Sequence, residues 1–422
     1  MGISYPECIV SGELLKKAVR GMGKIPFRYD KESPFRFLVF GAEEKEWLAL
    51  RAVDENAFFE FYATGDGVDI SLEGQAALDI RDFKKTIEYS PALRNNKIRF
   101  GGTMGGKRGA TLTVQAGQKS ITRLPLYDAS RVLGMFPDIE SEVELFAMKP
   151  SIIQECLNKN LVMGLGTRRK DYVNLGLSLQ KNGETIRFVT TDSRRLVLTE
   201  GYWTVFADNI PPRILQELES GMVLPISVFE ILSGILAAVT KNALVTCAYS
   251  KAAHSEGITW IVFEDNLVFR VTGLFRKEFP TYQCFTDKTK AFEMEFSTEE
   301  LTMALKRIKS LAEFFQVTVF NCNSEKKYID IEAIRGPTTF SKEPVSYDNQ
   351  RGSLAQDLVM GANISFTIDA LSRIPSEKVL MEVDGSFQPI RFTPIFEQGK
   401  KDSLKTNIQI VMPINLAVTF TQ

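Results

Sequence analysis

The chain repeats one pattern of secondary structure three times, and this recurrence constrains its fold more than any single motif does. Amphipathic helices with polar caps are predicted to begin near Ser11, Met148 and Ser297. A second helix follows each of these and is centred on Phe83, Phe229 and Leu371, which lie 146 and 142 positions apart. Phe136-Pro137 and Phe279-Pro280, which are 143 positions apart, end the first two units. A period near one third of the 422 residues predicts one architecture used three times.

Outside these helices the hydrophobic pattern alternates with a period of two, as in residues 36–53 and 260–275. This alternation predicts antiparallel strands separated by Gly, Asn, Asp and Ser turns. The fold class is therefore α+β, with three domains of two helices packed on antiparallel sheet. We predict domain boundaries at 1–140, 141–289 and 290–422. Residues 341–361 are polar and lack periodicity, so they are predicted to form a long loop or a disordered insertion.

The bulk composition excludes several classes of protein. The net charge of −1 argues against a protein that grips nucleic acid by total positive charge, although segregated charges remain compatible with DNA binding. The five cysteines are widely scattered without a CxxC pair, which favours reduced thiols. The first residues lack a signal-peptide pattern, and no charge-free run is long enough to span a membrane. A soluble intracellular protein is expected.

The sequence contains no convincing catalytic constellation. Gly101–Arg108 (GGTMGGKR) matches most of a phosphate-binding loop, but Arg108 stands where a hydroxyl must reach magnesium. The run also lies between two predicted strands, so a hairpin tip is the preferred interpretation; a nucleotide-binding enzyme that uses Lys107 is the alternative. His254 is the only histidine and has no recognisable nucleophile motif beside it. Metal-ligand spacing is absent as well. We expect no catalysis, no cofactor and no metal.

Charge is distributed unevenly between helices and strands. The six helical runs with their exits hold 19 Lys and Arg against 11 Asp and Glu, whereas the whole chain is nearly neutral. Basic helices on an acidic sheet body suit a protein whose helices face a polyanion. The alternative is a chance fluctuation helped by the choice of segment ends. The candidate DNA-binding residues are Lys16, Lys17, Arg20, Lys24, Arg168, Arg169 and Lys170.

Four motifs carry a resemblance to a known family. Residues 188–201 (FVTTDSRRLVLTEG) are similar to a strand-turn-strand signature that usually reads Thr-Asp-Gly-His-Arg-Leu at its turn. Residues 279–282 (FPTY), 363–366 (NISF) and 411–414 (VMPI) follow in the same order as that family's Phe-Pro-Asp-Tyr, Asn-Val-Ser-Tyr and Val-Met-Pro-Met. Together these motifs resemble the bacterial DNA polymerase III β sliding clamp. The resemblance is strong from about residue 140 onward and weak before it.

The resemblance implies a head-to-tail homodimer whose six domains close a ring around duplex DNA. It also implies an apolar pocket between domains two and three that binds short peptides of the replicative polymerase and the clamp loader. Met, Pro, Leu and Phe side chains suit such an adaptable groove; the alternative is that they are simply domain core. By position, the pocket residues would be Thr191, Ser193, Arg194, Arg195, Leu196, Pro280, Cys284, Phe285, Asn363, Phe366, Phe387, Val411, Met412, Pro413 and Ile414.

The chain also departs from the family pattern. Ser193-Arg194 replaces the usual Gly-His of the turn, and Cys284 replaces the usual Arg after the junction. The chain continues past Leu416, where family members typically end, through the residues AVTFTQ. Such divergence fits a phage or a distant bacterial lineage, with the protein in the cytoplasm near the nucleoid.

The predicted contacts between protomers join domain one to domain three. Ile121 and Leu311 are the candidate residues for that interface. A β-rich peptide-binding scaffold that is unrelated to DNA remains the further alternative function.

Overall fold

The computed structural model describes residues 6–22, 36–44, 46–54, 57–89, 97–103, 110–116, 120–165, 176–275, 279–287, 290–311, 317–323, 326–335, 338–352, 357–395 and 404–414. The chain forms two compact units, each built from two separate stretches of sequence. The first unit comprises Met1–Asn158 and Trp203–Lys277, and the second comprises Lys159–Tyr202 and Glu278–Gln422. Each unit is considered by itself.

The described elements confirm the threefold recurrence, because the order strand, helix, five strands, helix, three strands occurs three times. Repeat one contains β1 (Glu7–Ser11), α1 (Gly12–Gly21), β2 (Phe37–Glu43), β3 (Trp47–Asp54), β4 (Ala57–Ala63), β5 (Val68–Leu72), β6 (Gly74–Asp79), α2 (Ile80–Glu88), β7 (Lys97–Thr103), β8 (Thr111–Ala116) and β9 (Ser120–Pro125). Repeat two contains β10 (Ile139–Met148), α4 (Pro150–Leu165), β11 (Leu177–Asn182), β12 (Thr185–Thr191), β13 (Arg195–Tyr202), β14 (Val205–Phe206), β15 (Met222–Leu224), α6 (Ile226–Leu236), β16 (Leu244–Ala252), β17 (Ser255–Glu264) and β18 (Leu267–Leu274). Repeat three contains β19 (Phe292–Ser297), α8 (Thr298–Leu311), β20 (Val317–Cys322), β21 (Tyr328–Arg335), β22 (Thr338–Ser346), β23 (Gln350–Gly352), β24 (Leu358–Asn363), α9 (Ile364–Leu371), β25 (Lys378–Val383), β26 (Ile390–Ile395) and β27 (Leu404–Val411).

Among the described residues, three short helices lie outside this common pattern. Two of them follow repeats one and two, as α3 (Ser130–Leu133) and α7 (Gln283–Thr286). The third, α5 (Pro212–Ser220), is inserted between β14 and β15 of repeat two. The repeat is therefore a common order of elements with local additions.

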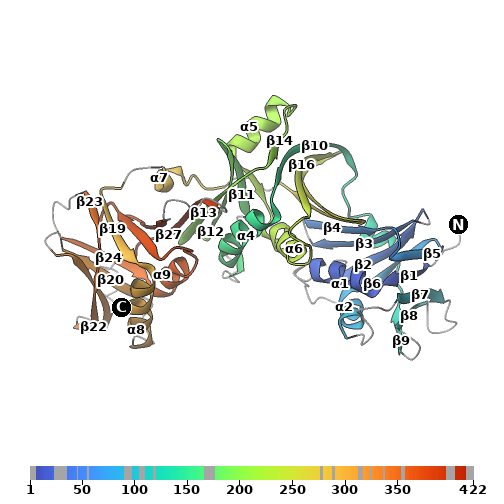
Figure 1. Cartoon of the computed structure of the whole chain (residues 1–422), viewed down its shortest axis with the longest axis horizontal. Helices are drawn as coiled ribbons and strands as arrows, with labels where there is room; N and C mark the ends of the chain where they lie inside the picture. The colour runs from blue at the N-terminus through green and yellow to red at the C-terminus, as the bar shows by residue number, and fades with distance from the viewer. Residues whose placement is uncertain are drawn as a thin grey trace. The chain divides into compact units, whose positions relative to one another are not determined.

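In the first unit, nine strands form one antiparallel sheet in the order β14-β10-β16-β17-β18-β4-β3-β2-β6 (Figure 1). The last strand of repeat two, β18, pairs with β4 of repeat one from Leu267 opposite Ala63 to Gly273 opposite Ala57. This junction between repeats is therefore continuous sheet. A second sheet in the same unit has the order β5-β1-β7-β8-β9.

The two faces of the first junction differ because alternate residues of a strand point to opposite sides. Phe61 of β4 and Phe269 of β18 face the helices, where their ring centroids lie 4.9 Å apart and both are fully buried. On that side α1 packs against α6, and a Cβ on Gly234 would lie 2.9 Å from the carbonyl oxygen of Gly21. Glycine at position 234 is therefore required by the close approach of these helices. Glu60 and Arg270 lie on the opposite face of the sheet.

In the second unit, strands of repeats two and three form a sheet in the order β11-β12-β13-β27-β26-β25-β19-β23. Here β13 pairs with β27, from Arg195 opposite Val411 to Gly201 opposite Leu404. A separate four-stranded sheet has the order β22-β21-β20-β24. A core cluster that includes Phe296 of β19 and Leu305 of α8 fills repeat three.

The prediction of a loop at 341–361 was wrong, since this stretch contains the end of β22, all of β23 and most of β24. β22 lies at the edge of its sheet, where one side of the strand needs no partner and polar side chains and a proline such as Pro344 are tolerated. Polar composition therefore concealed strand structure. The last helix also begins earlier than its predicted core, at Ile364, because Asn363 caps it.

The remaining predictions about local structure have these outcomes. The Ser297 hydroxyl accepts the backbone N–H of Glu300 at 3.3 Å, which confirms the predicted cap of α8. β7 and β8 pair as the predicted antiparallel hairpin, although residues 104–109 at its tip lie outside the described residues. None of the five cysteines forms a disulfide. In the described parts of the chain, no helix is long and apolar enough to cross a bilayer.

Candidate peptide-binding site and nucleic-acid interface

The signature turn after β12 is organised by two side chains. The Thr191 hydroxyl donates to the carbonyl of Arg195 at 2.7 Å and accepts the backbone N–H of Ser193 at 3.2 Å. One Asp192 carboxylate oxygen accepts the backbone N–H groups of Arg194 and Arg195 at 3.0 and 2.8 Å. These bonds hold Ser193 at a φ of 68°, a left-handed conformation that glycine adopts at lower cost. The departure from glycine at this position is therefore accommodated at the cost of backbone strain.

Arg195 ties this turn to the last helix. Its guanidinium binds the Asp192 carboxylate at 2.8 and 3.0 Å and the Asp369 carboxylate at 3.0 Å. The same guanidinium lies over the Phe366 ring, 4.2 Å from its centroid. Arg195 is buried, so its charge depends on these carboxylates for compensation. Its main observable role is to connect β13 with α9.

The segments that carry the other two motifs of repeat three converge on the same region. The Asn363 side chain accepts the backbone N–H of Phe366 at 3.1 Å, which caps α9. Met412 donates its N–H to the carbonyl of Arg194 at 2.8 Å, and Ile414 donates to Gly361 at 2.8 Å. The chain after β27 is therefore held between the signature turn and β24.

An apolar cluster lies beside these contacts on β13 and β27. Its buried members are Val189, Leu196, Leu198, Tyr282 and Ile410, and its partly buried members are Phe279, Phe285, Ile408 and Met412. The Tyr282 hydroxyl donates to Gln180 at 2.5 Å. Burial raises the pKa of Tyr282 although Arg187 opposes this shift, so the phenol stays neutral at physiological pH. The cluster offers partly exposed apolar and aromatic surface next to a polar turn.

The predicted pocket residues thus differ in where they lie. Leu196, Phe285 and Met412 belong to the apolar cluster, whereas Phe366 packs against the core of repeat three. Thr191, Ser193, Arg194 and Arg195 form the turn, and Asn363 caps α9. Val411 is fully buried in the core of repeat three and is not exposed to a ligand. The exposed or half-buried residues are Pro280, Cys284, Phe387, Pro413 and Ile414.

Sequence reasoning missed several members of the cluster, namely Val189, Leu198, Phe279, Tyr282, Ile408 and Ile410. The signal was present, because Leu196 and Leu198 alternate along β13 and Ile408 and Ile410 alternate along β27. Alternation identifies residues on one face of a strand. It does not reveal that β13 and β27, about 200 residues apart, are neighbours.

The candidate DNA-binding residues are only partly described. The Lys17 ammonium binds the Glu264 carboxylate at 2.6 Å, which compensates its charge within the fold. Burial alone would raise the pKa of Glu264, but hydrogen bonds from Lys17 and from the backbone of Thr240 hold it below its ordinary value. Lys16 is half-buried and Arg20 is exposed on α1. Lys24, Arg168, Arg169 and Lys170 lie outside the described residues.

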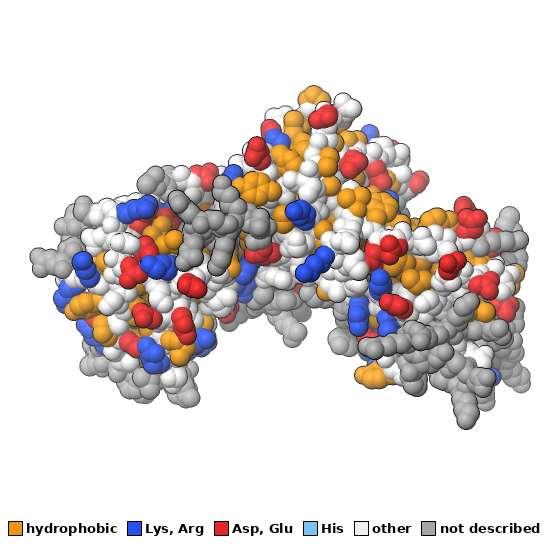
Figure 2. All heavy atoms as spheres, in the orientation of Figure 1, with side chains coloured by type: hydrophobic (Ala, Val, Ile, Leu, Met, Phe, Trp, Pro, Cys, Tyr) orange, Lys and Arg blue, Asp and Glu red, His pale blue; other side chains and the backbone are white. Residues whose placement is uncertain are grey.

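The surface does not carry a single positive face in the view of Figure 2, where Lys and Arg side chains are interspersed with Asp and Glu. Several helical cations are paired within the fold, including Arg307 of α8 with Glu343. Lys17 and Arg307 therefore have their charges compensated within the fold. Among the described side chains, no group of three or more His, Cys, Asp and Glu is arranged to hold a metal ion.

The candidate residues for the protomer interface lie on elements of repeats one and three. Ile121 is 57% exposed on β9, the edge strand of its sheet. Leu311 is the last residue of α8, and its side chain lies outside the described part of the structure. α8 packs against β22, which is the edge strand of its own sheet.

The chain is built from repeated two-helix domains whose sheets join edge to edge. The comparison with solved structures agrees over nearly the whole chain. DNA polymerase III β subunit from Thermotoga maritima matches with a TM-score of 0.75 and 18% identity, covering 98% of this chain and all of that one. The sliding clamp of Bacillus subtilis gives 0.74 and 16%, with coverage of 97% and 99%. That of Pseudomonas aeruginosa, crystallised with a ligand, gives 0.72 and 18%, with coverage of 98% and 100%.

Comparison by sequence finds no match to this chain. No protein-family model matches it. No curated protein matches it at a significant level. The chain nevertheless has the fold of the bacterial DNA polymerase III β sliding clamps, and the resemblance predicted from its four motifs is confirmed at that level.

Proposed function

We propose that this protein is a sliding clamp that acts as a polymerase processivity factor. Two copies would close a ring of six domains around duplex DNA, in the cytoplasm of a bacterial or phage-infected cell. The three domains would follow the predicted boundaries at 1–140, 141–289 and 290–422. The protein would hold the replicative polymerase and the clamp loader without catalysing a reaction itself.

The pairing of equivalent sheet edges is the observation that carries this proposal. In both internal junctions, the third strand after the first helix of one repeat pairs with the last strand of the next repeat. β4 pairs with β18 in this way, and β13 pairs with β27. The equivalent strands that remain are β22 of repeat three and β9 of repeat one, and both are edge strands in their sheets.

A second copy would complete this pattern by placing its β9 against β22 of the first. Two such contacts in a head-to-tail pair close a ring, whereas an isolated chain leaves both edges unused. Unpaired edges expose backbone donors and acceptors, which favours pairing with another strand. Pro344 withholds one donor from β22, so the pairing would rely on the remaining residues of that edge.

The solution mass tests this assembly. The wild-type protein is expected to sediment as a dimer at micromolar concentration, and Ile121→Glu on β9 is expected to weaken the dimer at least tenfold. Leu72→Glu is the matched control, because Leu72 is 49% exposed on β5 at the opposite edge of the same sheet. A monomeric wild-type protein, or equal weakening by both variants, would contradict the proposed ring.

Encirclement predicts a topological dependence that ordinary binding lacks. The loaded dimer should remain on nicked circular DNA and should be released when that DNA is linearised. Contacts with phosphates must be weak for a ring to slide, which suits the mixed charge of the surface. Equal retention on circular and linear DNA would instead favour the alternatives of a nucleotide-binding enzyme or an unrelated peptide-binding scaffold.

The apolar cluster at the β13–β27 junction would be the docking site for peptides of the polymerase and the loader. Partly exposed Phe285 and Met412 supply adaptable apolar contacts, and the flanking turn supplies backbone and hydroxyl groups. The test uses a fluorescein-labelled pentapeptide that ends in leucine and phenylalanine. Met412→Ser should weaken its binding several-fold and leave DNA retention intact.

A charge reversal separates the DNA contacts from the peptide site. Replacing Arg168, Arg169 and Lys170 with glutamate should impair loading or processivity while the affinity for the labelled pentapeptide stays at the wild-type value. A loss of peptide binding in this variant would count against the separation. The nucleotide-binding alternative predicts that Lys107→Ala abolishes ATP binding, whereas the clamp predicts no ATP binding in either protein.

A further inference from the structure

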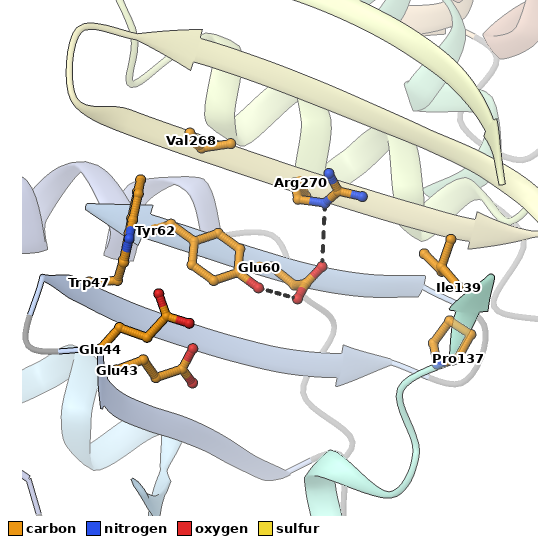
Figure 3. Close-up of a pocket in the computed structure, with 9 residues that line it drawn as sticks. All are labelled: Glu43, Glu44, Trp47, Glu60, Tyr62, Pro137, Ile139, Val268 and Arg270. Atoms are coloured by element: carbon orange, nitrogen blue, oxygen red, sulfur yellow. Dashed lines mark hydrogen bonds and ion pairs between the residues drawn. The ribbon is translucent and has the colours of Figure 1, made fainter. Parts of the chain in front are cut away.

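A cavity of about 520 Å³ lies on the outer face of the first unit, at the junction of β4 and β18 (Figure 3). Trp47, Tyr62 and Val268 form one part of its wall, and Pro137 and Ile139 form another part. This volume lies within the range of sites that bind small ligands or peptide side chains. The cavity lies entirely in the first unit and is separate from the apolar cluster at the β13–β27 junction.

The charged side chains that line this cavity have a net negative charge. Glu43, Glu44, Glu60 and Arg270 line it. The Glu60 carboxylate accepts the Tyr62 hydroxyl at 2.6 Å and lies 3.6 Å from the Arg270 guanidinium. Glu44 is exposed at the turn between β2 and β3, with a positive φ of 53°. Its carboxylate adds charge at the rim of the cavity.

The surrounding ion pairs do not cancel this charge. Arg51 binds Glu43 at 2.5 and 3.0 Å, and Arg270 binds Glu142 at 2.5 Å. These two cations pair with Glu43, Glu60 and Glu142, and Glu44 adds a fourth carboxylate at the cavity, so negative groups outnumber positive ones among the described residues of the network. Burial raises the pKa of Tyr62 to about 12, and the nearby Glu60 carboxylate adds to the shift. The cavity is therefore suited to a cation.

The aromatic wall favours a cationic side chain further. The Trp47 and Tyr62 rings meet edge to face with centroids 6.5 Å apart. An ammonium or guanidinium group over such rings is attracted by their π-electrons. Arg51 already illustrates this chemistry, since its guanidinium carbon lies 5.4 Å from the Tyr62 centroid.

An exposed apolar row leads into the cavity across four adjacent strands. Leu244 of β16 lies opposite Phe263 of β17, Phe263 lies opposite Val268 of β18, and Val268 lies opposite Tyr62 of β4. Leu244 is 53% exposed and Phe263 is 41% exposed. Neighbouring strands are about 4.8 Å apart, so the row extends about 14 Å, which four or five residues of an extended peptide would span.

We propose that this surface binds a short segment of a partner protein in which large apolar residues precede an arginine or lysine by three or four positions. The apolar residues would lie on Leu244 and Phe263, and the cation would enter the cavity between Trp47 and the carboxylates. We choose a basic segment because of charge complementarity. An acidic segment would be repelled by the carboxylates of Glu43, Glu44 and Glu60. The site would give the protein a second docking surface at its first junction.

The test uses the full-length protein and a labelled hexapeptide of sequence Leu-Phe-Gly-Ser-Arg-Arg. Binding is measured by fluorescence anisotropy and by the change in tryptophan emission, to which Trp47 in the cavity wall contributes beside the two other tryptophans. We expect saturable binding that weakens with added salt, since exposed charges are screened. A peptide with glutamates in place of the arginines should bind at least tenfold more weakly.

Two variants locate the binding on the protein. Glu44→Lys and Phe263→Ser should each weaken the arginine peptide at least fivefold. The controls are Glu184→Lys, at an exposed turn in the second unit, and Val359→Ser, which replaces a side chain of similar exposure on β24. Both controls should bind as the wild type does, with unchanged circular dichroism in every variant.

The possible outcomes separate this proposal from the proposed clamp function. Met412→Ser should leave the arginine peptide bound, which distinguishes this surface from the β13–β27 site. The proposal is overturned if the wild type does not bind the arginine peptide, if the glutamate peptide binds equally well, or if neither variant weakens binding. A change of solution mass in Phe263→Ser would instead identify the row as a contact between copies and would also overturn it. The three binding results leave the edge-strand test of the ring unaffected.

Discussion

The two internal junctions share one pairing of strands but differ in chemistry. At the β4–β18 junction, the outer face carries an ionic network centred on Glu60 and Arg270 and an open cavity. At the β13–β27 junction, the corresponding pairing carries an apolar cluster with aromatic side chains from the segment after repeat two. The first junction therefore presents mainly carboxylates, and the second presents mainly apolar side chains.

This difference arises from the outward-facing residues of otherwise similar strands. β4 places Glu60 and Tyr62 outward while Phe59 and Phe61 fill the core, whereas β13 places Leu196 and Leu198 in the outer cluster. Pairing of the backbone depends little on side chains, so a repeated scaffold can keep its geometry while its surfaces diverge. The repeats thus share their strand pairing and differ in the side chains that face outward.

The largest expected difference between the junctions concerns their arginines. Arg195→Met should lower the free energy of unfolding by about 3 kcal/mol, because the Asp192 carboxylate would stay buried without its cation. Arg270→Met should cost only about 1 kcal/mol, since Arg270 and Glu142 are each about one quarter exposed. Urea denaturation measures both values. Equal losses in the free energy of unfolding would contradict the prediction that the Arg195 ion pair contributes more to stability than the Arg270 ion pair.

Alkaline pH should destabilise the first junction through Tyr62. The folded-state pKa of about 12 exceeds the ordinary value of 10, so this stabilisation is complete below about pH 10 and is lost as the pH rises through 12. After allowance for partial exposure the loss is about 1 kcal/mol. In Tyr62→Phe the melting temperature should fall less between about pH 10 and pH 12 than in the wild type. The control Tyr89→Phe, at an exposed tyrosine, should behave as the wild type does. If Tyr62→Phe leaves the dependence of melting temperature on pH unchanged, Tyr62 does not cause the alkaline destabilisation.

Cys284 offers a way to change the chemistry of the second junction. Cys284→Arg would place a cation beside the apolar cluster at an exposed position, where ion pairs contribute about 0.2–1 kcal/mol. A labelled pentapeptide that carries one glutamate should therefore bind up to about fivefold more tightly, with no change for a neutral peptide. Cys284→Ser is the control and should leave both affinities unchanged. A gain for the neutral peptide would point to a packing effect.

The smallest expected effect lies in the signature turn. Ser193→Gly should raise the free energy of unfolding by about 0.5 kcal/mol, because glycine adopts a positive φ without a steric penalty, although part of this gain is lost to chain entropy. Glu184→Gly, in another exposed turn, should destabilise slightly or have no effect. Thermal unfolding followed by circular dichroism compares the two variants. Destabilisation by Ser193→Gly would show that the serine side chain supports the turn.

The outcome for individual residues shows how far prediction from sequence reaches. Periodicity identified all six repeat helices, and local rules identified Ser297 as a cap. The same rules failed at β22, where an edge position relaxes the need for apolar alternation. The pairing of Arg195 with Asp369 and the cavity beside Trp47 were not predicted, since their residues lie on strands and helices far apart in the chain.

The sequence by itself therefore determined the threefold order of elements, and its four motifs predicted the fold through their resemblance to the clamps. These features follow from local spacing, because helix and strand periods and caps are set by neighbours in the chain. Tertiary structure alone decided which strands adjoin, which carboxylates neutralise Lys17 and Arg195, and which apolar residues remain exposed. Those properties depend on contacts between distant segments, and the strand pairing of β4 with β18 and of β13 with β27 created both candidate binding surfaces.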